Sequence, residues 1–212
     1  MVSTVKEHDT RSKLINAATE VFVEKGFSGA RVEEIGRQAR ANKAMIYYHF
    51  GSKQGLYKAV LLKHIGGLHE EIARVAQDAD PLARLLAFYA ALGRKFQGRP
   101  ALPFMLFREI LAGGVHMDAE VARAFTGVLD FVRATVQEGI AAGRLRPVNP
   151  LFVHLSIMAP MMLFCVSRPF RERLLPVVPE EEPPAIEAFF EHMYDVLART
   201  LAMDQVPLGT RS

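Results

Sequence analysis

Apolar residues recur at helical spacing along most of the chain, and no stretch alternates in the manner of a strand. The first predicted helix covers 14–25 and ends at Gly26, and its apolar stripe consists of Leu14, Ile15, Ala18, Val21 and Phe22. Further helices are predicted over 54–77, 81–97, 104–112, 118–142, 150–166 and 185–203, with loops around 143–147 and over 176–184. Pro160 is expected to bend or break the helix over 150–166. The pattern therefore predicts an all-α fold.

Two short helices with a tight break between them are predicted within 32–53. The first covers 32–39 and turns Val32, Ile35 and Ala39 toward a core. The second begins near Asn42, whose side chain can accept a hydrogen bond from an amide two or three residues later, and it turns Ile46 and Phe50 inward. This layout is typical of a helix-turn-helix that enters the major groove of DNA.

The outward side chains of the second helix suit contact with DNA. Those small or flexible enough to approach base edges are Asn42, Lys43, Ala44 and Met45. Those with hydroxyl, imidazole or ammonium groups for phosphate oxygens are Tyr47, Tyr48, His49 and Lys53. A purely structural interpretation makes both tyrosines half-buried packing residues and His49 a surface imidazole.

This segment resembles the N-terminal region of the TetR family of transcriptional regulators. The positions that match the family pattern are Ala17, Phe22, Gly26, Phe27, Ile35, Ala39, Lys43, Tyr47, Tyr48, Phe50, Lys53 and Leu56. The resemblance covers residues 10–60. It implies a three-helix DNA-binding domain over 1–53 and a larger helical domain for effector binding and dimerisation over 54–212.

Two arginines depart from the family pattern. Arg40 stands where the turn usually has a glycine, and a left-handed arginine costs on the order of 1–2 kcal/mol. Arg31 stands where Ser or Thr commonly caps the first motif helix. Each arginine is either a phosphate contact or a tolerated surface change. The candidate DNA-binding set is completed by these and their neighbours: Arg31, Val32, Arg40 and Ala41.

Composition agrees with a folded DNA-binding protein. Half of the 212 residues are hydrophobic, which is enough for a substantial core. The net charge is only +3, but cations concentrate near the motif, at Lys6, Arg11, Lys13, Arg31, Arg37, Arg40, Lys43 and Lys53. A single cysteine and no apolar segment approaching the ~20 residues of a membrane span favour a reduced, soluble cytoplasmic protein.

The region beyond the motif carries candidates for a ligand pocket and a dimer interface. A cavity is expected among soft and aromatic side chains, although a single residue of this kind is more often ordinary core: Phe88, Phe104, Met105, Phe107, Met158, Met161, Met162 and Cys165. Arg108 joins this set because a cation after an apolar run needs a ligand anion, a nearby acid such as Glu109, or a stem that lets its head group reach solvent. The family resemblance implies a hydrophobic or amphipathic effector.

A reader of twofold DNA sites needs two recognition helices about 34–36 Å apart, which requires a dimer. In the family the last two main helices of each subunit form a four-helix interface. The residues expected there are Leu151, Leu155, Ile186, Phe189, Phe190, Met193 and Leu197. The helix that follows Lys53 is the expected lever between effector and DNA.

The sequence thus predicts a homodimeric repressor that a small hydrophobic or amphipathic effector releases from a palindromic operator. An effector-dependent activator and a helical small-molecule carrier with a non-binding head are the alternatives. An enzyme is disfavoured, because no phosphate loop or nucleophile elbow occurs and His64 and His69 are five residues apart, so they diverge around a helix. No cofactor, metal or membrane partner is expected.

Overall fold

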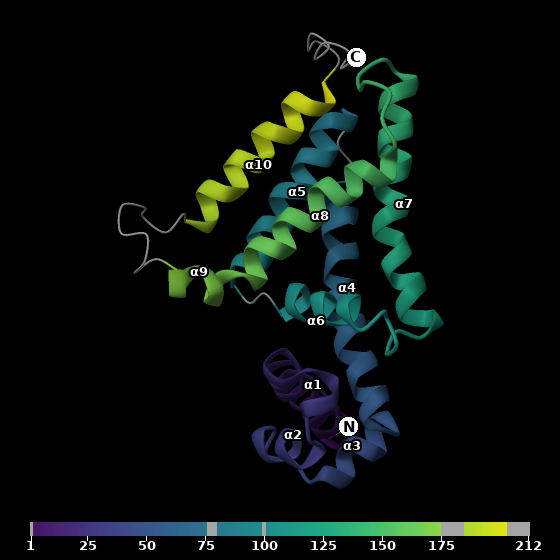
Figure 1. Cartoon of the computed structure of the whole chain (residues 1–212). Helices are drawn as coiled ribbons and strands as arrows, with labels where there is room; N and C mark the ends of the chain where they lie inside the picture. The colour runs from purple at the N-terminus through teal and green to yellow at the C-terminus, as the bar shows by residue number, and fades with distance from the viewer. Residues whose placement is uncertain (1, 76–79, 99–100, 175–184, 203–212) are drawn as a thin grey trace. The chain divides into compact units, whose positions relative to one another are not determined.

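The computed structural model describes residues 2–75, 80–98, 101–174 and 185–202. These residues form ten helices and no strand, which confirms the all-α prediction (Figure 1). The helices are α1 (Val2–Gly29), α2 (Val32–Gln38), α3 (Lys43–Phe50), α4 (Lys53–Val75), α5 (Pro81–Gly98), α6 (Ala101–Leu111), α7 (Ala119–Ala141), α8 (Pro150–Val166), α9 (Arg168–Leu174) and α10 (Ile186–Leu201).

The contacts divide the chain into two compact units. The first comprises Met1–Gly67 and Ala101–Phe125, and the second comprises Leu68–Pro100 and Thr126–Ser212. The division falls within α4, and α6 joins the N-terminal helices. The expected domain boundary after residue 53 therefore stays a prediction, since the DNA-binding motif folds together with residues well beyond it.

The core of the first unit is built from α1, α2 and α3, the early part of α4, and α6. Phe22 of α1 is fully buried and meets the ring of Tyr57 of α4 edge-on, with 4.8 Å between ring centroids. Gly26 interrupts the helical conformation of α1 with φ 69° and ψ 179°, as expected for a glycine near a helix end. The aromatic contacts around Phe22 anchor the helices that carry the motif.

The second unit places α10 against α5 and α8 (Figure 1). Phe164 of α8 stacks on Phe189 of α10 with ring centroids 4.1 Å apart. Gly93 of α5 allows close approach, because a Cβ there would lie 3.2 Å from the ring of Phe190. Two aromatic residues of α10 thus pack within the chain itself.

The helices depart from the sequence prediction in four places, the first of which is α1, which begins at Val2 and runs to Gly29 although the prediction covered only 14–25. α8 continues through Pro160, so a break there is wrong, while a bend at this residue stays a prediction; the nearby Ile157 and Met161 are fully buried, and this packing holds the helix across the missing N–H. α6 begins at Ala101 because Pro103 falls in its first turn, where proline is tolerated. α9 was not predicted, and it has no buried residue that could have given it an apolar stripe.

No single helix in the described part of the chain is long and apolar enough to cross a membrane. Together, α8 and α9 have the length and composition of a membrane span, but they are bent by 56° relative to each other. Several side chains of α8, among them Val153 and Ile157, are buried within the protein.

Candidate DNA-binding site

The second motif helix, α3, begins as the sequence predicts. Asn42 has extended backbone angles, and its side-chain Oδ1 accepts a hydrogen bond of 2.9 Å from the Ala44 N–H. This bond satisfies one of the amides that every helix leaves unpaired at its N-terminus. Ile46 is fully buried and fixes the inner face of α3. The helix ends at Gly51, which has φ 73°.

The first motif helix, α2, supports α3 through its buried residues Ile35 and Gly36 and through the buried Ala39 that caps its C-terminus. A Cβ at Gly36 would lie 3.0 Å from the carbonyl oxygen of Ala41, so this glycine permits the close approach of α2 to the turn. Arg31 precedes α2 without a side-chain capping hydrogen bond, as its departure from Ser or Thr predicts.

The turn between the two helices forces Arg40 into the left-handed region, with φ 53°. The Arg40 N–H donates to the Arg37 carbonyl at 3.1 Å, and the Ala41 N–H donates to the Gly36 carbonyl at 2.9 Å. This pair of bonds is a Schellman motif, whose left-handed position is usually a glycine. The expectation that Arg40 occupies a glycine conformation is therefore correct.

The outer face of α3 leaves most of the predicted contact residues accessible. Asn42, Lys43, Ala44, Tyr47 and Tyr48 are exposed, and the two tyrosine side chains are 51% and 70% exposed. Both tyrosine side chains therefore lie on the accessible face of α3.

Three residues of α3 are only partly exposed: Met45, His49 and Phe50. Phe50 was predicted to point inward, and the guanidinium of Arg11 lies 5.3 Å from its ring centroid. Its ring is therefore shared between the core and a cation on α1.

The cations of the motif are held by contacts within the first unit. Lys43 Nζ lies 3.1 Å from Glu33 Oε1, and both side chains are more than half exposed. Lys53 Nζ donates to the Ser28 carbonyl at 3.4 Å and lies 4.7 Å from the ring centroid of Phe27. Burial lowers the pKa of Lys53. Both ammonium groups are positioned by neighbours before any phosphate arrives.

The predicted pocket residues are divided between the two units, and a common cavity among them stays a prediction. Phe104, Met105, Phe107 and Arg108 belong to the first unit, and Phe88, Met158, Met161, Met162 and Cys165 belong to the second. Arg108 Nη2 donates to two carbonyls of α1, to Glu24 at 3.1 Å and to Val23 at 3.4 Å. Cys165 is buried, and burial raises the pKa of its thiol to about 11.

The predicted interface residues fall into two groups. Leu151 and Leu155 of α8 are 44% and 50% exposed, whereas Phe190 and Leu197 of α10 are already buried within the chain. Phe189 and Met193 are intermediate, and the side chain of Ile186 lies outside the described residues. The exposed apolar stripe of α8 also includes Phe152 and Leu163, which the prediction did not name.

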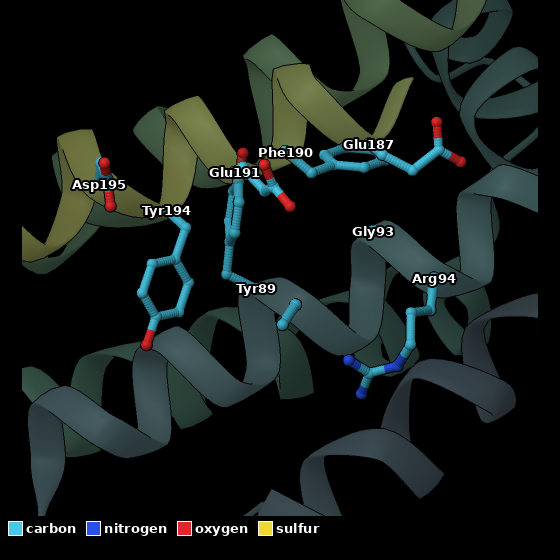
Figure 2. A pocket seen from close by; sticks show the side chains of 9 residues that line it. Tyr89, Gly93, Arg94, Glu187, Phe190, Glu191, Tyr194 and Asp195 are labelled. Atoms are coloured by element: carbon cyan, nitrogen blue, oxygen red, sulfur yellow. The ribbon is translucent and has the colours of Figure 1, made fainter. Parts of the chain in front are cut away.

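Two polar clusters were missed by sequence reasoning. In the first unit, Glu109 is 2% exposed and contacts Tyr57 and His116. In the second, a pocket of about 530 Å³ lies between α5 and α10 (Figure 2). The only sequence signal for the Glu109 cluster was an acid within an apolar helix. The pocket had no sequence signal, because its residues on α5 and α10 lie about a hundred positions apart.

The arrangement of α1 to α3 on an all-helical chain defines a class of protein, the helix-turn-helix DNA-binding regulators. The model of the family described as "Bacterial regulatory proteins, tetR family" matches residues 14–60. The chain is similar to the HTH-type transcriptional repressor NicS of Pseudomonas putida, with 33% identity over 140 residues that cover 65% of this chain and 66% of NicS.

It is also similar to the HTH-type transcriptional regulator RutR of Escherichia coli, with 26% identity over 149 residues and 70% of each chain covered. Among solved structures, AibR in complex with isovaleryl coenzyme A and operator DNA superimposes with a TM-score of 0.71 at 18% identity, over 88% of this chain and 97% of AibR. The chain belongs to the TetR family of bacterial regulatory proteins. Its relatives are DNA-binding transcriptional regulators and not enzymes, which confirms the prediction that excluded an enzyme.

Proposed function

We propose that this protein is a transcriptional repressor that binds a palindromic operator as a homodimer and is released by a small effector. The observation that carries the proposal is the exposed outer face of α3. The inner face of α3 is buried at Ile46, and its outer face presents the Asn42 cap, the small Ala44 and two exposed tyrosines. A helix that enters the major groove requires such an accessible outer face. The named function of NicS supports repression.

The dimer is proposed to form through the exposed stripe of α8. Phe152, Leu155 and Leu163 are each at least half exposed and recur along the helix at three- and eight-residue intervals. An apolar face of this kind in a chain of this family fits a second copy of the chain. Sedimentation at micromolar concentration should give a dimer, and Leu155→Glu should give a monomer that retains its helical circular dichroism.

The response to an effector is proposed to pass through α4. This helix begins at Lys53 beside the motif, and its residues Leu56, Val60 and Ile65 are fully buried in the first unit before the helix continues to Val75. A ligand that changes operator affinity by 5–150-fold needs about 1–3 kcal/mol of preference for one state. The structure of AibR with both isovaleryl coenzyme A and operator DNA supports the presence of both binding functions in one protein of this fold.

The first experiment is selection of random duplex DNA on the purified protein at near-physiological salt, where nonspecific attraction is screened. We expect enrichment of one palindrome. Lys43→Ala should reduce binding to it, whereas Arg133→Ala, which removes an exposed cation of α7, should leave binding unchanged. A sequence without twofold symmetry would contradict the dimeric mode, and no enriched sequence would favour the carrier.

The sign of regulation is tested separately. A promoter that carries the selected palindrome across its start site should be silenced by the protein in a purified transcription reaction. Stimulation in place of silencing would replace repression with the alternative of activation. The site of action is proposed to be the cytoplasm, where the chromosome is accessible.

A further inference from the structure

The pocket between α5 and α10 lies wholly within the second unit, and none of the residues expected to line an effector pocket belongs to it (Figure 2). Its volume of about 530 Å³ is within the range of small-molecule sites. The residues that line it are Tyr89, Ala90, Gly93, Arg94, Glu187, Phe190, Glu191, Tyr194 and Asp195.

Tyr89 brings an unsatisfied polar group to this pocket. Its side chain is fully buried, and its hydroxyl has no hydrogen-bond partner among the described atoms. Figure 2 shows the side chain directed from α5 toward α10. Buried hydroxyls are almost always paired, so an unpaired one at a pocket indicates a polar group that is absent from the isolated chain. Burial raises the pKa of Tyr89, and the hydroxyl therefore stays neutral.

Carboxylates dominate the charge of the lining. Glu187, Glu191 and Asp195 recur every four residues and share one face of α10. All three are exposed, and none forms an ion pair with another residue that the structure describes. Arg94 is the one cation among the lining residues, and in Figure 2 its side chain is directed away from α10. The wall formed by α10 therefore favours a cation.

Aromatic rings supply the apolar part of the lining. The rings of Tyr89 and Phe190 meet edge-on, with 6.4 Å between centroids. The ring of Tyr194 is 40% exposed and points from α10 toward α5 in Figure 2. Ring faces attract organic cations as well as apolar surface. Gly93 keeps the contact between the helices close, because a side chain there would meet Phe190 at 3.2 Å.

We propose that this pocket binds an organic ammonium ion with an aromatic or apolar body. The ammonium group lies between Glu191 and Asp195 and donates a hydrogen bond to the Tyr89 hydroxyl oxygen, and the body packs on Phe190 and Tyr194. A role for this cation in releasing DNA rests on the proposed function; its binding does not.

The test uses the full chain and three probes of one shape: 2-phenylethylammonium, 2-phenylethanol and phenylacetate. Calorimetric titration should show binding of the ammonium ion and at least tenfold weaker binding of the alcohol and of the acid. Tyr89→Phe and Glu191→Gln should each weaken ammonium binding about tenfold or more, as expected for a hydrogen bond or ion pair to a charged group.

The controls keep folding apart from binding. Tyr89→Phe removes a hydroxyl that makes no hydrogen bond, so the variant should fold as the parent does. Asp130→Asn removes an exposed carboxylate of α7 that does not line the pocket, and it should bind 2-phenylethylammonium normally. Any of three results overturns the proposal: phenylacetate binds as tightly as 2-phenylethylammonium, neither pocket variant changes the binding of 2-phenylethylammonium, or 2-phenylethylammonium does not bind at millimolar concentration.

The same protein preparation is then used for the DNA selection. An enriched operator without ammonium binding refutes this pocket and keeps the proposed regulator. Ammonium binding without any enriched DNA keeps the pocket and refutes the regulator. Binding of both, with release of the operator by 2-phenylethylammonium in the parent but not in Glu191→Gln, assigns the pocket as the effector site.

Discussion

The hydroxyl of Tyr57 donates a hydrogen bond of 2.9 Å to Oε1 of Glu109, and both side chains are almost completely buried. The same carboxylate accepts the His116 backbone N–H at 3.3 Å through Oε2, and His116 Nδ1 lies 2.9 Å from Oε1. Glu109 thereby joins α4, α6 and the segment after α6 within the unit that carries the DNA-binding motif. A buried carboxylate is stable only with such partners.

Removal of the Tyr57 hydroxyl should therefore destabilise the protein. Tyr57→Phe leaves a buried carboxylate with one donor fewer, and we expect a loss of about 1–3 kcal/mol in the free energy of unfolding, measured by urea titration. Tyr89→Phe is the matched control, because that buried hydroxyl has no hydrogen-bond partner in the described structure. Equal losses in the two variants would show that the Tyr57–Glu109 bond contributes nothing.

The two buried tyrosines also predict a loss of stability in alkali. Burial and, for Tyr57, the hydrogen bond to Glu109 raise both pKa values above the ordinary value of 10.0. A group with a raised folded-state pKa contributes stability that is complete below its unfolded pKa and is lost as the pH rises toward the folded pKa. Each tyrosine should thus cost about 1.4 kcal/mol per pH unit above about pH 10.

This dependence is measured by urea titration at pH values between about 8 and about 11. Tyr57→Phe and Tyr89→Phe should each make the alkaline fall shallower, and the double variant should be the shallowest. A fall of unchanged steepness in the double variant would assign the alkaline loss to other groups.

The sequence allowed the motif to be predicted almost residue by residue, because its signals are local. The cap at Asn42 and the strained turn at Arg40 depend on residues at most five positions apart, and the inward position of Ile46 follows from the helical periodicity. Tyr57 and Glu109 are 52 residues apart, and Tyr89 and Phe190 are about a hundred apart. No periodicity records such pairs, so both polar clusters appeared only with the tertiary structure.

Arg108 shows the same limit in a single residue. Its position after an apolar run indicated a partner, but the sequence did not show that the partners are carbonyls of Val23 and Glu24 at the end of α1. A cation at a helix C-terminus satisfies unpaired carbonyls and interacts favourably with the helix dipole. Sequence reasoning therefore identified the need for a partner and not its identity.

Replacement of Arg108 should reduce stability. We expect Arg108→Met to lose about 1 kcal/mol in the free energy of unfolding. Two α1 carbonyls lose the guanidinium as donor, and the loss is small because the site is exposed and water can donate in its place. Arg108→Lys should recover part of the loss, since it restores one charged donor. Arg133→Met is the control, because it removes only an exposed surface pair. If Arg108→Met leaves the free energy of unfolding unchanged, the bonds to α1 are not what Arg108 provides, and a contact with a ligand anion again becomes the favoured role.

Arg40→Gly separates strain from DNA contact. Glycine relieves the strain of a left-handed arginine, which costs about 1–2 kcal/mol, but it also raises the entropy of the unfolded chain. The free energy of unfolding should therefore rise by a net of about 1 kcal/mol or less, which thermal unfolding measures. Arg40→Lys keeps both the strain and the charge and should unfold as the parent does. Operator affinity then decides the second question: a fall in Arg40→Gly identifies a phosphate contact, and a rise identifies strain in the recognition turn.

Glu33 should act as a competitor of the DNA backbone. Its carboxylate lies 3.1 Å from Lys43 Nζ on the exposed side of the motif. A hydrogen bond from its own backbone N–H and, to a smaller extent, the hydrogen bond from Lys43 hold the pKa of Glu33 below its ordinary value, so the carboxylate is charged at neutral pH. Phosphate must displace this carboxylate to reach the ammonium group. Glu33→Gln should therefore raise operator affinity several-fold, and Lys43→Ala should lower it and reduce the salt slope by about 1.

Glu34→Gln is the matched control for this prediction. Glu34 occupies the same turn of α2 and carries the same charge, but it pairs with Lys25 of α1 and not with a residue of α3. If the gain in Glu33→Gln comes from the release of Lys43, Glu34→Gln should show a smaller gain, and Lys43→Ala should abolish the advantage of Glu33→Gln in the double variant. Equal gains in operator affinity from Glu33→Gln and Glu34→Gln, unaffected by Lys43→Ala, would contradict the prediction. They would indicate that each substitution acts only by reducing the negative charge near the DNA, because an electrostatic field at physiological salt reaches over about 8 Å.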